Sequence, residues 1–515
     1  MAGVREVAIV ALVGGAAILG FELSAARLVS PFYGQSFVVW SLVISVTLTG
    51  LTGGYFAGGR LADRSAAPRR LLGWVLLAGA AALTVSGLLT PAVLTATRPL
   101  GLRWGAALAC ALVAAPPMIC LGALAPTLVR AAGGSVEDLG RIAGRLYAIS
   151  TIGSFVGALM FGFWLIPALG GRGSVFTISL GLLASFGLVM SREKVLSAAP
   201  AGVGLAAVLL SLMLFREPAL RVYDPSTRQY WTVVHKAEGL MGRVVVADLP
   251  FDETITWRYL FVDGIPQSYV TLPSNESGAP YVHALSIRAA AKPAGSRALL
   301  LGLGAGSLVS ELKSLGIATD AVEIDARIEI VARRHFSLPD DCRVFVDDAR
   351  HHLLVSGETY DLVIVDCFSG ERIPGHLLTL EAFESVKRRL RPGGAILINY
   401  TGFVAGRPGY GSRSIAATLA EAGFRVSALA TGSDESGRNL IITGSLGDTE
   451  LGAPAKTNAC CGPHAAALVA VDLSKEPAMV LTDDRGELEL FNVDYHEHLR
   501  SRILQDYPSE LFLEP

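Results

Sequence analysis

Residues 298–325 read ALLLGLGAGSLVSELKSLGIATDAVEID, and this stretch decides the fold of the C-terminal half of the chain. An apolar run typical of a buried strand ends at Gly302, and a helical pattern follows Ser307. Glycines at such a turn let a ligand approach the backbone, and the helix N-terminus favours polar or anionic groups. Glu323 ends the next strand about twenty residues further on, where a carboxylate can accept both hydroxyls of a ribose. The stretch therefore predicts a strand–helix–strand unit with a candidate nucleoside site.

Apolar runs that resemble strands alternate with helical stretches over the whole C-terminal part. They lie at residues 298–303, 320–324, 343–346, 361–366, 395–400, 425–430 and 438–443. Strands separated by helices form βαβ units, so we expect a Rossmann-like, doubly wound α/β sheet of the class I methyltransferase type. Shorter alternating strands precede it, with Asp263-Gly264 as a hairpin turn, which predicts a small N-terminal β-hairpin subdomain.

Carboxylates recur where the predicted strands end. The third strand runs into Asp347-Asp348-Ala349, where a carboxylate could receive the exocyclic amine of adenine. Any one acid at such a position could equally cap a helix, as we expect of Asp325. Acids at the carboxyl ends of neighbouring parallel strands share one edge of the sheet, so Glu323 and Asp348 together form a candidate adenosine cradle.

Asp366 ends the fourth strand, where the reactive end of a bound donor would lie. An amine acceptor is mostly ammonium at neutral pH, so its attack on a carbon beside a sulfonium needs a base to remove a proton. Asp366 is the candidate for that general base, and the alternative is an acid that only ends the strand.

The N-terminal part has a different character. The chain has 515 residues, 17% of them charged, and a positive mean hydropathy, which is too apolar for an ordinary soluble enzyme of this size. A helix needs about 20 apolar residues to cross a bilayer, and about seven candidate spans are present. They lie at residues 7–28, 37–59, 71–91, 104–129, 144–168, 173–191 and 196–215. Their small residues predict close helix packing; those considered are Gly14, Gly15, Gly20, Gly50, Gly53, Gly54, Gly58 and Gly59.

Three regions are therefore expected. A transmembrane helical bundle covers residues 1–215, a linker and small antiparallel β subdomain covers 216–275, and a Rossmann-like transferase domain covers 276–515. This is the organisation of a multi-pass protein of the cell membrane, with the lipid bilayer as a partner.

The side on which the C-terminal domain lies is left open. Basic residues cluster after the second, fourth and sixth spans, which places the N-terminus in the cytoplasm by the positive-inside rule. Seven spans would then carry the C-terminal domain to the opposite side. A cytosolic nucleoside donor instead favours a cytoplasmic domain.

Composition also excludes several classes of protein. A formal net charge of −2 gives no basic surface for nucleic acid, so none is expected as a partner. The six cysteines form no CxxC pair and no ligand spacing with histidine, so neither a disulfide framework nor a metal site is expected.

The motifs resemble those of the polyamine aminopropyltransferases, the spermidine synthases. The chain as a whole is similar to the membrane-fused branch described as fused transporter/spermidine-synthase proteins. The resemblance rests on residues 22–34 and 58–64 in the membrane part, and on 261–267, 302–307, 322–325, 347–349, 360–374, 376–379 and 391–394 in the C-terminal part.

For the donor, the resemblance implies decarboxylated S-adenosylmethionine, or S-adenosylmethionine itself, as a co-substrate, with no tightly bound cofactor. It assigns the general base to Asp366 and the ribose carboxylate to Glu323. Further implied donor contacts are Gly302, Gly304, Asp348 and Ala349.

For the acceptor, the resemblance implies a small amine or polyamine such as putrescine, bound by Tyr281, Gln267 and Ser369. It also implies a homodimer. The acceptor half nevertheless departs from the family, because Ala305 and Ser369 stand where the family has carboxylates. Each charge-assisted contact to an ammonium contributes roughly 1.5–3 kcal/mol, so the loss of two would weaken binding of a diamine by about two orders of magnitude.

Three hypotheses follow. The first is a membrane-anchored aminopropyltransferase of the spermidine synthase type, with Asp366 as base. The second keeps the fold and uses S-adenosylmethionine to methylate an amine or a lipid-associated substrate, which Ala305 favours. The third is a nucleoside or polyamine sensor, or a transport accessory, without catalysis.

Overall fold

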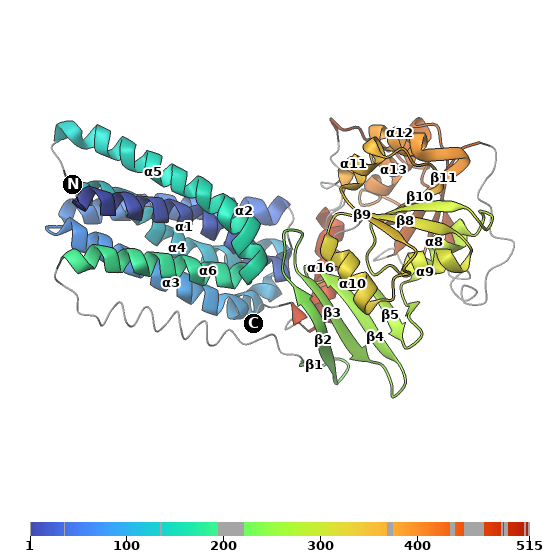
Figure 1. Ribbon diagram of the computed structural model, residues 1–515, viewed down its shortest axis with the longest axis horizontal. Coiled ribbons are helices and arrows are strands. Elements are labelled where there is room, and N and C mark those ends of the chain that lie inside the picture. The colour runs from blue at the N-terminus through green and yellow to red at the C-terminus, as the bar shows by residue number, and fades with distance from the viewer. Residues whose placement is uncertain are drawn as a thin grey trace. The chain divides into compact units, whose positions relative to one another are not determined.

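The computed structural model describes residues 2–34, 37–133, 136–193, 221–367, 374–432, 438–447, 468–485, 488, 493–508 and 511–512. The chain divides into two compact units (Figure 1). The helical unit comprises Met1–Leu220, Glu238–Gly242 and Ser509–Pro515. The sheet unit comprises Arg221–Ala237 and Arg243–Pro508.

Long apolar helices build the helical unit and lie side by side (Figure 1). Over the described residues they are α1 (Ala2–Tyr33), α2 (Phe37–Arg64), α3 (Pro68–Thr97), α4 (Gly101–Ala132), α5 (Leu139–Met160) and α6 (Ile166–Arg192). Four continuous helical stretches are long and apolar enough to cross a membrane: Arg5–Tyr33, Val38–Arg64, Pro68–Ala132 and Leu139–Ser191, of which the last two each include two of these helices. The predicted span at 196–215 lies outside the described residues.

Small residues bring these helices close together. A Cβ added at Gly54 of α2 would lie 2.8 Å from the Cα of Gly122 in α4. One added at Gly20 of α1 would lie 2.7 Å from a ring carbon of Phe161. Gly59 is different, because no atom lies within 4 Å of its Cβ position. The predicted packing role is therefore right for most of these glycines and wrong for Gly59.

The sheet unit begins with an antiparallel sheet of strands in sequential order. Its strands are β1 (Arg221–Asp224), β2 (Gln229–Ala237), β3 (Val244–Pro250), β4 (Thr256–Val262), β5 (Ile265–Leu272) and β6 (Glu276–Ser277). Asp263 and Gly264 join β4 to β5 with φ of 49° and 77°, the left-handed backbone that a two-residue hairpin turn requires. The predicted hairpin turn is confirmed, although the sheet has more strands than the sequence suggested.

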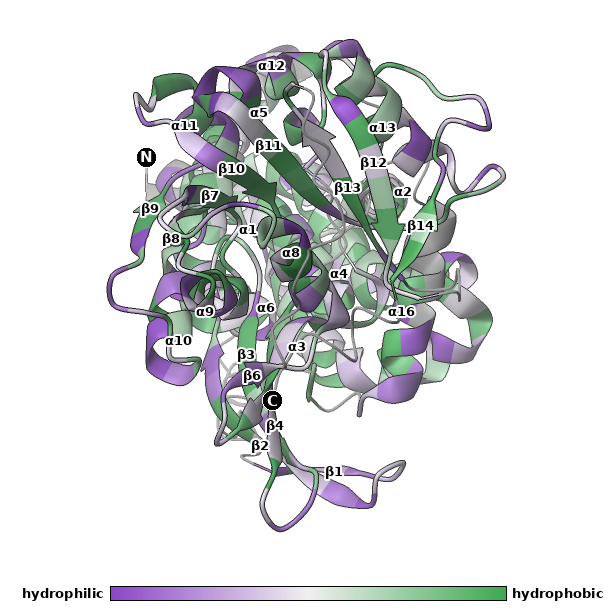
Figure 2. Ribbon diagram, turned by 90° about the vertical axis from the view of Figure 1, so that its right-hand side faces the viewer, coloured by the Kyte–Doolittle hydropathy of each residue, from purple (hydrophilic) through white to green (hydrophobic). Residues whose placement is uncertain are grey.

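A second sheet has the order β14-β12-β13-β11-β10-β7-β8-β9 over the described residues (Figure 2). Its strands are β7 (Arg297–Leu301), β8 (Ala318–Glu323), β9 (Arg343–Val346), β10 (Tyr360–Val365), β11 (Leu390–Thr401), β12 (Arg425–Ala430), β13 (Asn439–Ser445) and β14 (Val469–Val471). The pairings from β9 through β11 are parallel, whereas β13 runs antiparallel to β11 and β12. All seven predicted strands are present, and β14 was not predicted.

Helices cover both faces of this sheet. They are α8 (Pro280–Ala289), α9 (Ser307–Ser314), α10 (Ala326–His335), α11 (Ala349–Val355), α12 (Leu380–Arg389) and α13 (Tyr410–Glu421), with α16 (Val493–Asp506) near the end of the described chain. Successive strand residues point to opposite faces. Leu300 accordingly belongs to the core under α8 and α9, whereas Leu299 and Leu301 belong to the core under α12 and α13.

Candidate active site

The strand order reverses between β7 and β10, and ligands of open α/β sheets bind at the carboxyl edge of such a switch point. Gly302 follows β7 and Asp366 follows β10, and the Asp366 amide donates to the Leu301 carbonyl at 2.8 Å. Gly302 has a φ of 89°, and a Cβ added there would lie 2.8 Å from the carbonyl carbon of Asp366. Only glycine fits this position, so the loop and the candidate base touch through their backbones.

The rest of the glycine loop leaves room for a ligand. Gly304 has a φ of 54°, and no atom lies within 4 Å of its Cβ position. Gly306 is the N-cap of α9, and Ala305 is buried with 2% exposure. The loop therefore presents backbone and open space, with no carboxylate at residue 305.

Glu323 ends β8 and faces this loop. Its Oε2 accepts a hydrogen bond from the Leu303 amide and its Oε1 accepts one from the Asp325 amide, both at 3.0 Å. Each oxygen keeps a further lone pair for a ribose hydroxyl. Burial raises the pKa of Glu323, and the backbone hydrogen bonds oppose that rise.

Asp325 and Asp348 both cap helices. The Asp325 side chain accepts from the Arg327 amide at the start of α10, as predicted. Asp348 Oδ1 accepts from the His351 amide at 3.0 Å, so it caps α11. Its Oδ2 lies 3.4 Å from His376 Nε2 and remains the oxygen that could meet an adenine amine.

A backbone hydrogen bond nevertheless joins the end of β9 to the end of β8. The Asp347 amide donates to the Glu323 carbonyl at 3.1 Å, which brings Asp348 and the buried Ala349 to the same edge as Glu323. The structure thus brings the predicted donor residues to neighbouring strand ends on one edge of the sheet.

Asp366 is the partly buried carboxylate at the switch point of the sheet. Burial raises its pKa to about 6, and hydrogen bonds from Asn399 and Tyr281 oppose the rise. Asn399 Nδ2 donates to Asp366 Oδ1 at 2.8 Å, and Asn439 Nδ2 donates to Asn399 Oδ1 at 2.9 Å. The Asn439 bond occupies the Asn399 carbonyl, so the Asn399 amide group is turned toward Asp366.

Of the three predicted acceptor residues, Tyr281 lies beside the candidate base, whereas the Gln267 side chain turns elsewhere. The Tyr281 hydroxyl of α8 donates a hydrogen bond to the Gln267 carbonyl at 3.3 Å and lies beside Asp366. Burial and the nearby Asp366 carboxylate hold the pKa of Tyr281 well above its usual range, so it stays a neutral phenol. The Gln267 side chain turns back to the Ile265 carbonyl at 3.2 Å and meets Tyr281 only through its backbone. Ser369 lies outside the described residues.

Sequence reasoning missed Asn399 and Asn439. The available signal was an amide inside each of two otherwise apolar strands, near the point where β11 ends and β13 begins. Among the described residues, no group of three His, Cys, Asp or Glu side chains could hold a metal ion.

A glycine turn after β7, a carboxylate at the end of β8 and a partly buried acid at the switch point define a Rossmann-like domain of the methyltransferase type. No protein-family model matches the chain. A stretch of 174 residues is 30% identical to a probable polyamine aminopropyl transferase of Bifidobacterium longum, and it covers 33% of this chain and 38% of that protein. The chain is thus similar to the polyamine aminopropyltransferases over part of its length.

Other similar proteins include a methyltransferase. A stretch of 117 residues is 36% identical to an N-terminal histidine N-methyltransferase of Emericella nidulans, over 22% of this chain and 21% of that protein. The chain therefore spans well under half the length of these curated relatives. Among solved structures, a probable spermidine synthase from Corynebacterium glutamicum is similar with a TM-score of 0.40 and 23% identity, over 48% of this chain and 96% of that one.

Proposed function

We propose that the sheet unit is an aminopropyltransferase that moves an aminopropyl group from decarboxylated S-adenosylmethionine to a small amine, with Asp366 as general base. The observation that carries the proposal is the partly buried Asp366 carboxylate, whose backbone lies against the glycine loop and whose side chain accepts from Asn399 and lies beside Tyr281. A base is most effective when its pKa lies near the working pH, and burial raises the pKa of Asp366 to about 6.

The reaction assigns a task to each side chain. Asp366 takes a proton from the acceptor ammonium, which frees the nitrogen lone pair. The nitrogen attacks the methylene carbon beside the sulfonium, the carbon–sulfur bond breaks, and its electron pair stays on sulfur in the leaving methylthioadenosine. Tyr281 and Asn399 orient the carboxylate, and Glu323 accepts the ribose hydroxyls. The Gly304 backbone allows the donor to approach.

The test is turnover by the purified full-length protein. With decarboxylated S-adenosylmethionine and a panel of amines, the wild type should release methylthioadenosine and an aminopropylated amine, both identified by mass spectrometry. Asp366→Asn should lower turnover by about 10³-fold or more and leave methylthioadenosine binding intact, since the amide cannot accept the proton. Glu358→Gln is the control, because Glu358 pairs with Arg297 at the opposite edge of the sheet. Wild-type turnover in Asp366→Asn would remove Asp366 as base.

A methyltransferase is the second candidate, favoured by the buried Ala305 and by similarity to the Emericella nidulans enzyme. An acid at residue 305 would suit the amine of a decarboxylated donor, and none is present there. The mass added to the acceptor separates a methyl from an aminopropyl group. Nucleoside binding without turnover on any amine would instead support the sensor hypothesis.

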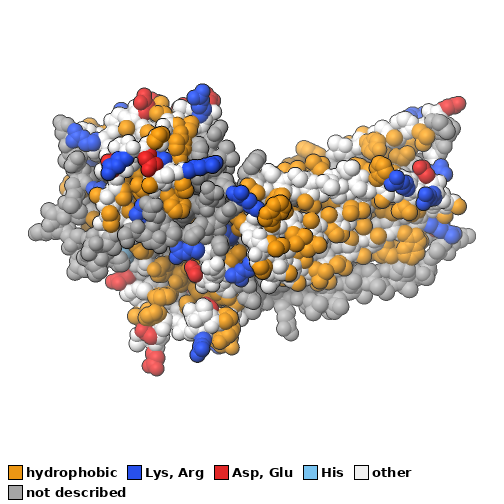
Figure 3. Space-filling view, turned by 180° about the vertical axis from the view of Figure 1, so that it is seen from behind, with side chains coloured by type: hydrophobic (Ala, Val, Ile, Leu, Met, Phe, Trp, Pro, Cys, Tyr) orange, Lys and Arg blue, Asp and Glu red, His pale blue; other side chains and the backbone are white. Residues whose placement is uncertain are grey.

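We further propose that the helical unit anchors the enzyme in a membrane. Large apolar side chains are exposed on its surface, including Phe56, Trp104, Phe155 and Trp164. Figure 3 shows such hydrophobic side chains spread over the helices. In water this exposure would be unfavourable, whereas lipid would cover it. The donor is a cytosolic nucleoside, so the proposed side for the sheet unit is the cytoplasm.

A further inference from the structure

Helix α8 carries, besides Tyr281, a buried histidine that the proposed reaction does not use. His283 follows Tyr281 by two residues in the first turn of α8, which places the two side chains about 200° apart around the helix. Tyr281 reaches Asp366, while His283 contacts β6 and α9. A change at His283 can therefore be transmitted to Tyr281 through one helical turn.

The surroundings of His283 favour the protonated, charged ring. Its Nε2 lies 2.8 Å from the Ser277 carbonyl, and its Nδ1 lies 2.8 Å from Glu311 Oε1. The Ser277 carbonyl only accepts hydrogen bonds, so Nε2 carries a proton, and the Glu311 carboxylate beside Nδ1 favours a second proton on the ring. The two side chains are 7% and 16% exposed, which shields an imidazolium–carboxylate pair from solvent.

The charged groups that act on His283 come from the elements packed around it. Glu311 of α9 and Glu276 of β6 are both acids, and both favour the charged ring. The Glu311 carboxylate beside Nδ1 raises the pKa of His283, and burial opposes the rise. The charged pair is thus present below the folded-state pKa of His283 and is lost as the pH rises through that pKa.

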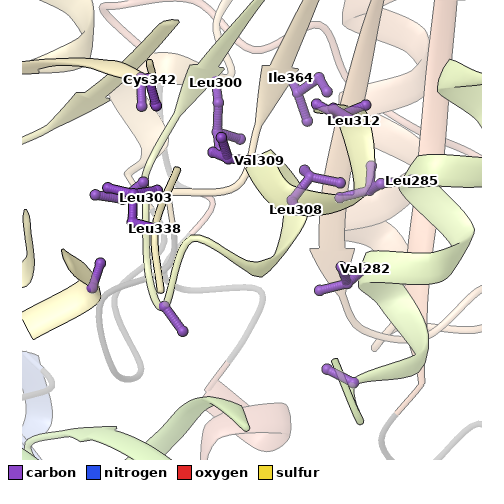
Figure 4. Packing of buried hydrophobic residues seen from close by; sticks show 14 of the residues in the cluster. Val282, Leu285, Leu300, Leu303, Leu308, Val309, Leu312, Leu338, Cys342 and Ile364 are labelled. Atoms are coloured by element: carbon purple, nitrogen blue, oxygen red, sulfur yellow. The ribbon is translucent and has the colours of Figure 1, made fainter. Parts of the chain in front are cut away.

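The pair joins the two elements that carry the two halves of the site. Glu311 belongs to α9, the helix that starts at the glycine loop, and His283 belongs to α8, which holds Tyr281 against the base. Val282 and Leu285 of α8 pack on Leu308 and Leu312 of α9 in one apolar cluster (Figure 4). Apolar packing brings α8 and α9 together, and the charged pair makes that contact depend on the orientation of the two helices.

We propose that the His283–Glu311 pair is a positioning clamp that sets Tyr281 relative to the glycine loop and gives the enzyme an alkaline limit. The proposal rests on the proposed function. When His283 loses its proton, Glu311 is left as a buried carboxylate without a cation, and α8 and α9 lose their fixed register. Tyr281 then no longer orients Asp366 for the acceptor.

The test compares the pH dependence of kcat/KM for the acceptor in wild type and Glu311→Gln. The amide keeps an acceptor for Nδ1 but removes the charge, so the alkaline midpoint should fall by about one pH unit, a tenfold change in proton affinity. At a pH below the alkaline midpoints of both proteins, kcat should be unchanged. Glu311→Asp retains the charge and should restore the wild-type midpoint.

The control is Asp341→Asn, which removes the exposed partner of Lys313. Lys313 lies on α9, as Glu311 does, and the alkaline midpoint should stay in place. The clamp is contradicted if Glu311→Gln has the wild-type midpoint, or if it loses the same factor in kcat at every pH. The ¹⁵N resonances of His283 in the full-length protein give a second readout that needs no turnover. A wild type inactive on all amines contradicts the proposed function, and an unshifted His283 titration in Glu311→Gln contradicts the clamp alone.

Discussion

At the scale of single residues, the proposed chemistry depends on opposing influences on the pKa of Asp366. Burial raises its pKa to about 6, while Asn399 and Tyr281 donate hydrogen bonds that favour the charged form. Without these donors the carboxyl group would keep its proton at a still higher pH and would be a poorer base at neutrality. Asn439 belongs to the same arrangement, because it holds the Asn399 carbonyl.

Asn399→Leu tests this balance. The substitution removes a donor that lowers the pKa of Asp366, so that pKa should rise and the acidic limb of kcat/KM should move to higher pH by about one unit. Activity at about pH 6.5 should fall roughly threefold and should match the wild type at about pH 9. A pH–rate profile with the wild-type acidic limb would contradict the assigned role of Asn399.

The acids could be proposed from the sequence and the amides could not. Asp366 and Glu323 end apolar runs, and the edge of a parallel sheet collects such positions. Asn399 lies 33 residues after Asp366 and bonds to it because β11 pairs with β10. Asn439 lies 40 residues after Asn399 and bonds to it because β13 pairs with β11. Sequence periodicity gives the existence of these strands but not which residues face one another.

At the scale of elements, most strands were predictable because β7, β8, β10, β11 and β13 are largely buried apolar runs, with helices on both faces of the sheet. Strand β14 was missed because it has only three residues, two of them exposed, and therefore lacks that pattern. Asp348 could be either a cap or a ligand residue from sequence, and the structure shows that the start of α11 uses one of its oxygens. Helix capping and ligand binding would thus compete for the Asp348 side chain.

The turn between β7 and α9 gives a sharp prediction at this scale. Gly302→Ala would place a methyl group against the Asp366 carbonyl at a φ of 89°, so it should cost roughly 1–3 kcal/mol of stability and weaken nucleoside binding. Thermal unfolding and titration with methylthioadenosine measure both effects. Gly357→Ala is the matched control, since no atom lies within 4 Å of its Cβ position. Equal behaviour of the two variants would contradict the close contact at Gly302.

At the scale of the whole molecule, an apolar helical unit and a sheet unit with a nucleoside-type site share one chain. The expected partner of the first is lipid and that of the second is a cytosolic donor. Compartment reporters fused to the C-terminus test whether the sheet unit lies on the cytosolic side of the membrane, where the donor is expected. A fluorescent protein should fold and emit there, and a phosphatase that works only outside the cytoplasm should be inactive. An active phosphatase would contradict a cytosolic donor.

The adenosine cradle at the strand ends is the claim on which the account depends, and calorimetric titration of methylthioadenosine tests it most directly. The wild type and Asp366→Asn should bind with similar affinity. Glu323→Gln should bind about 10- to 100-fold more weakly, because charge-assisted bonds to the ribose are replaced by neutral ones. Absence of binding to the wild type, or equal binding by Glu323→Gln, would contradict the account.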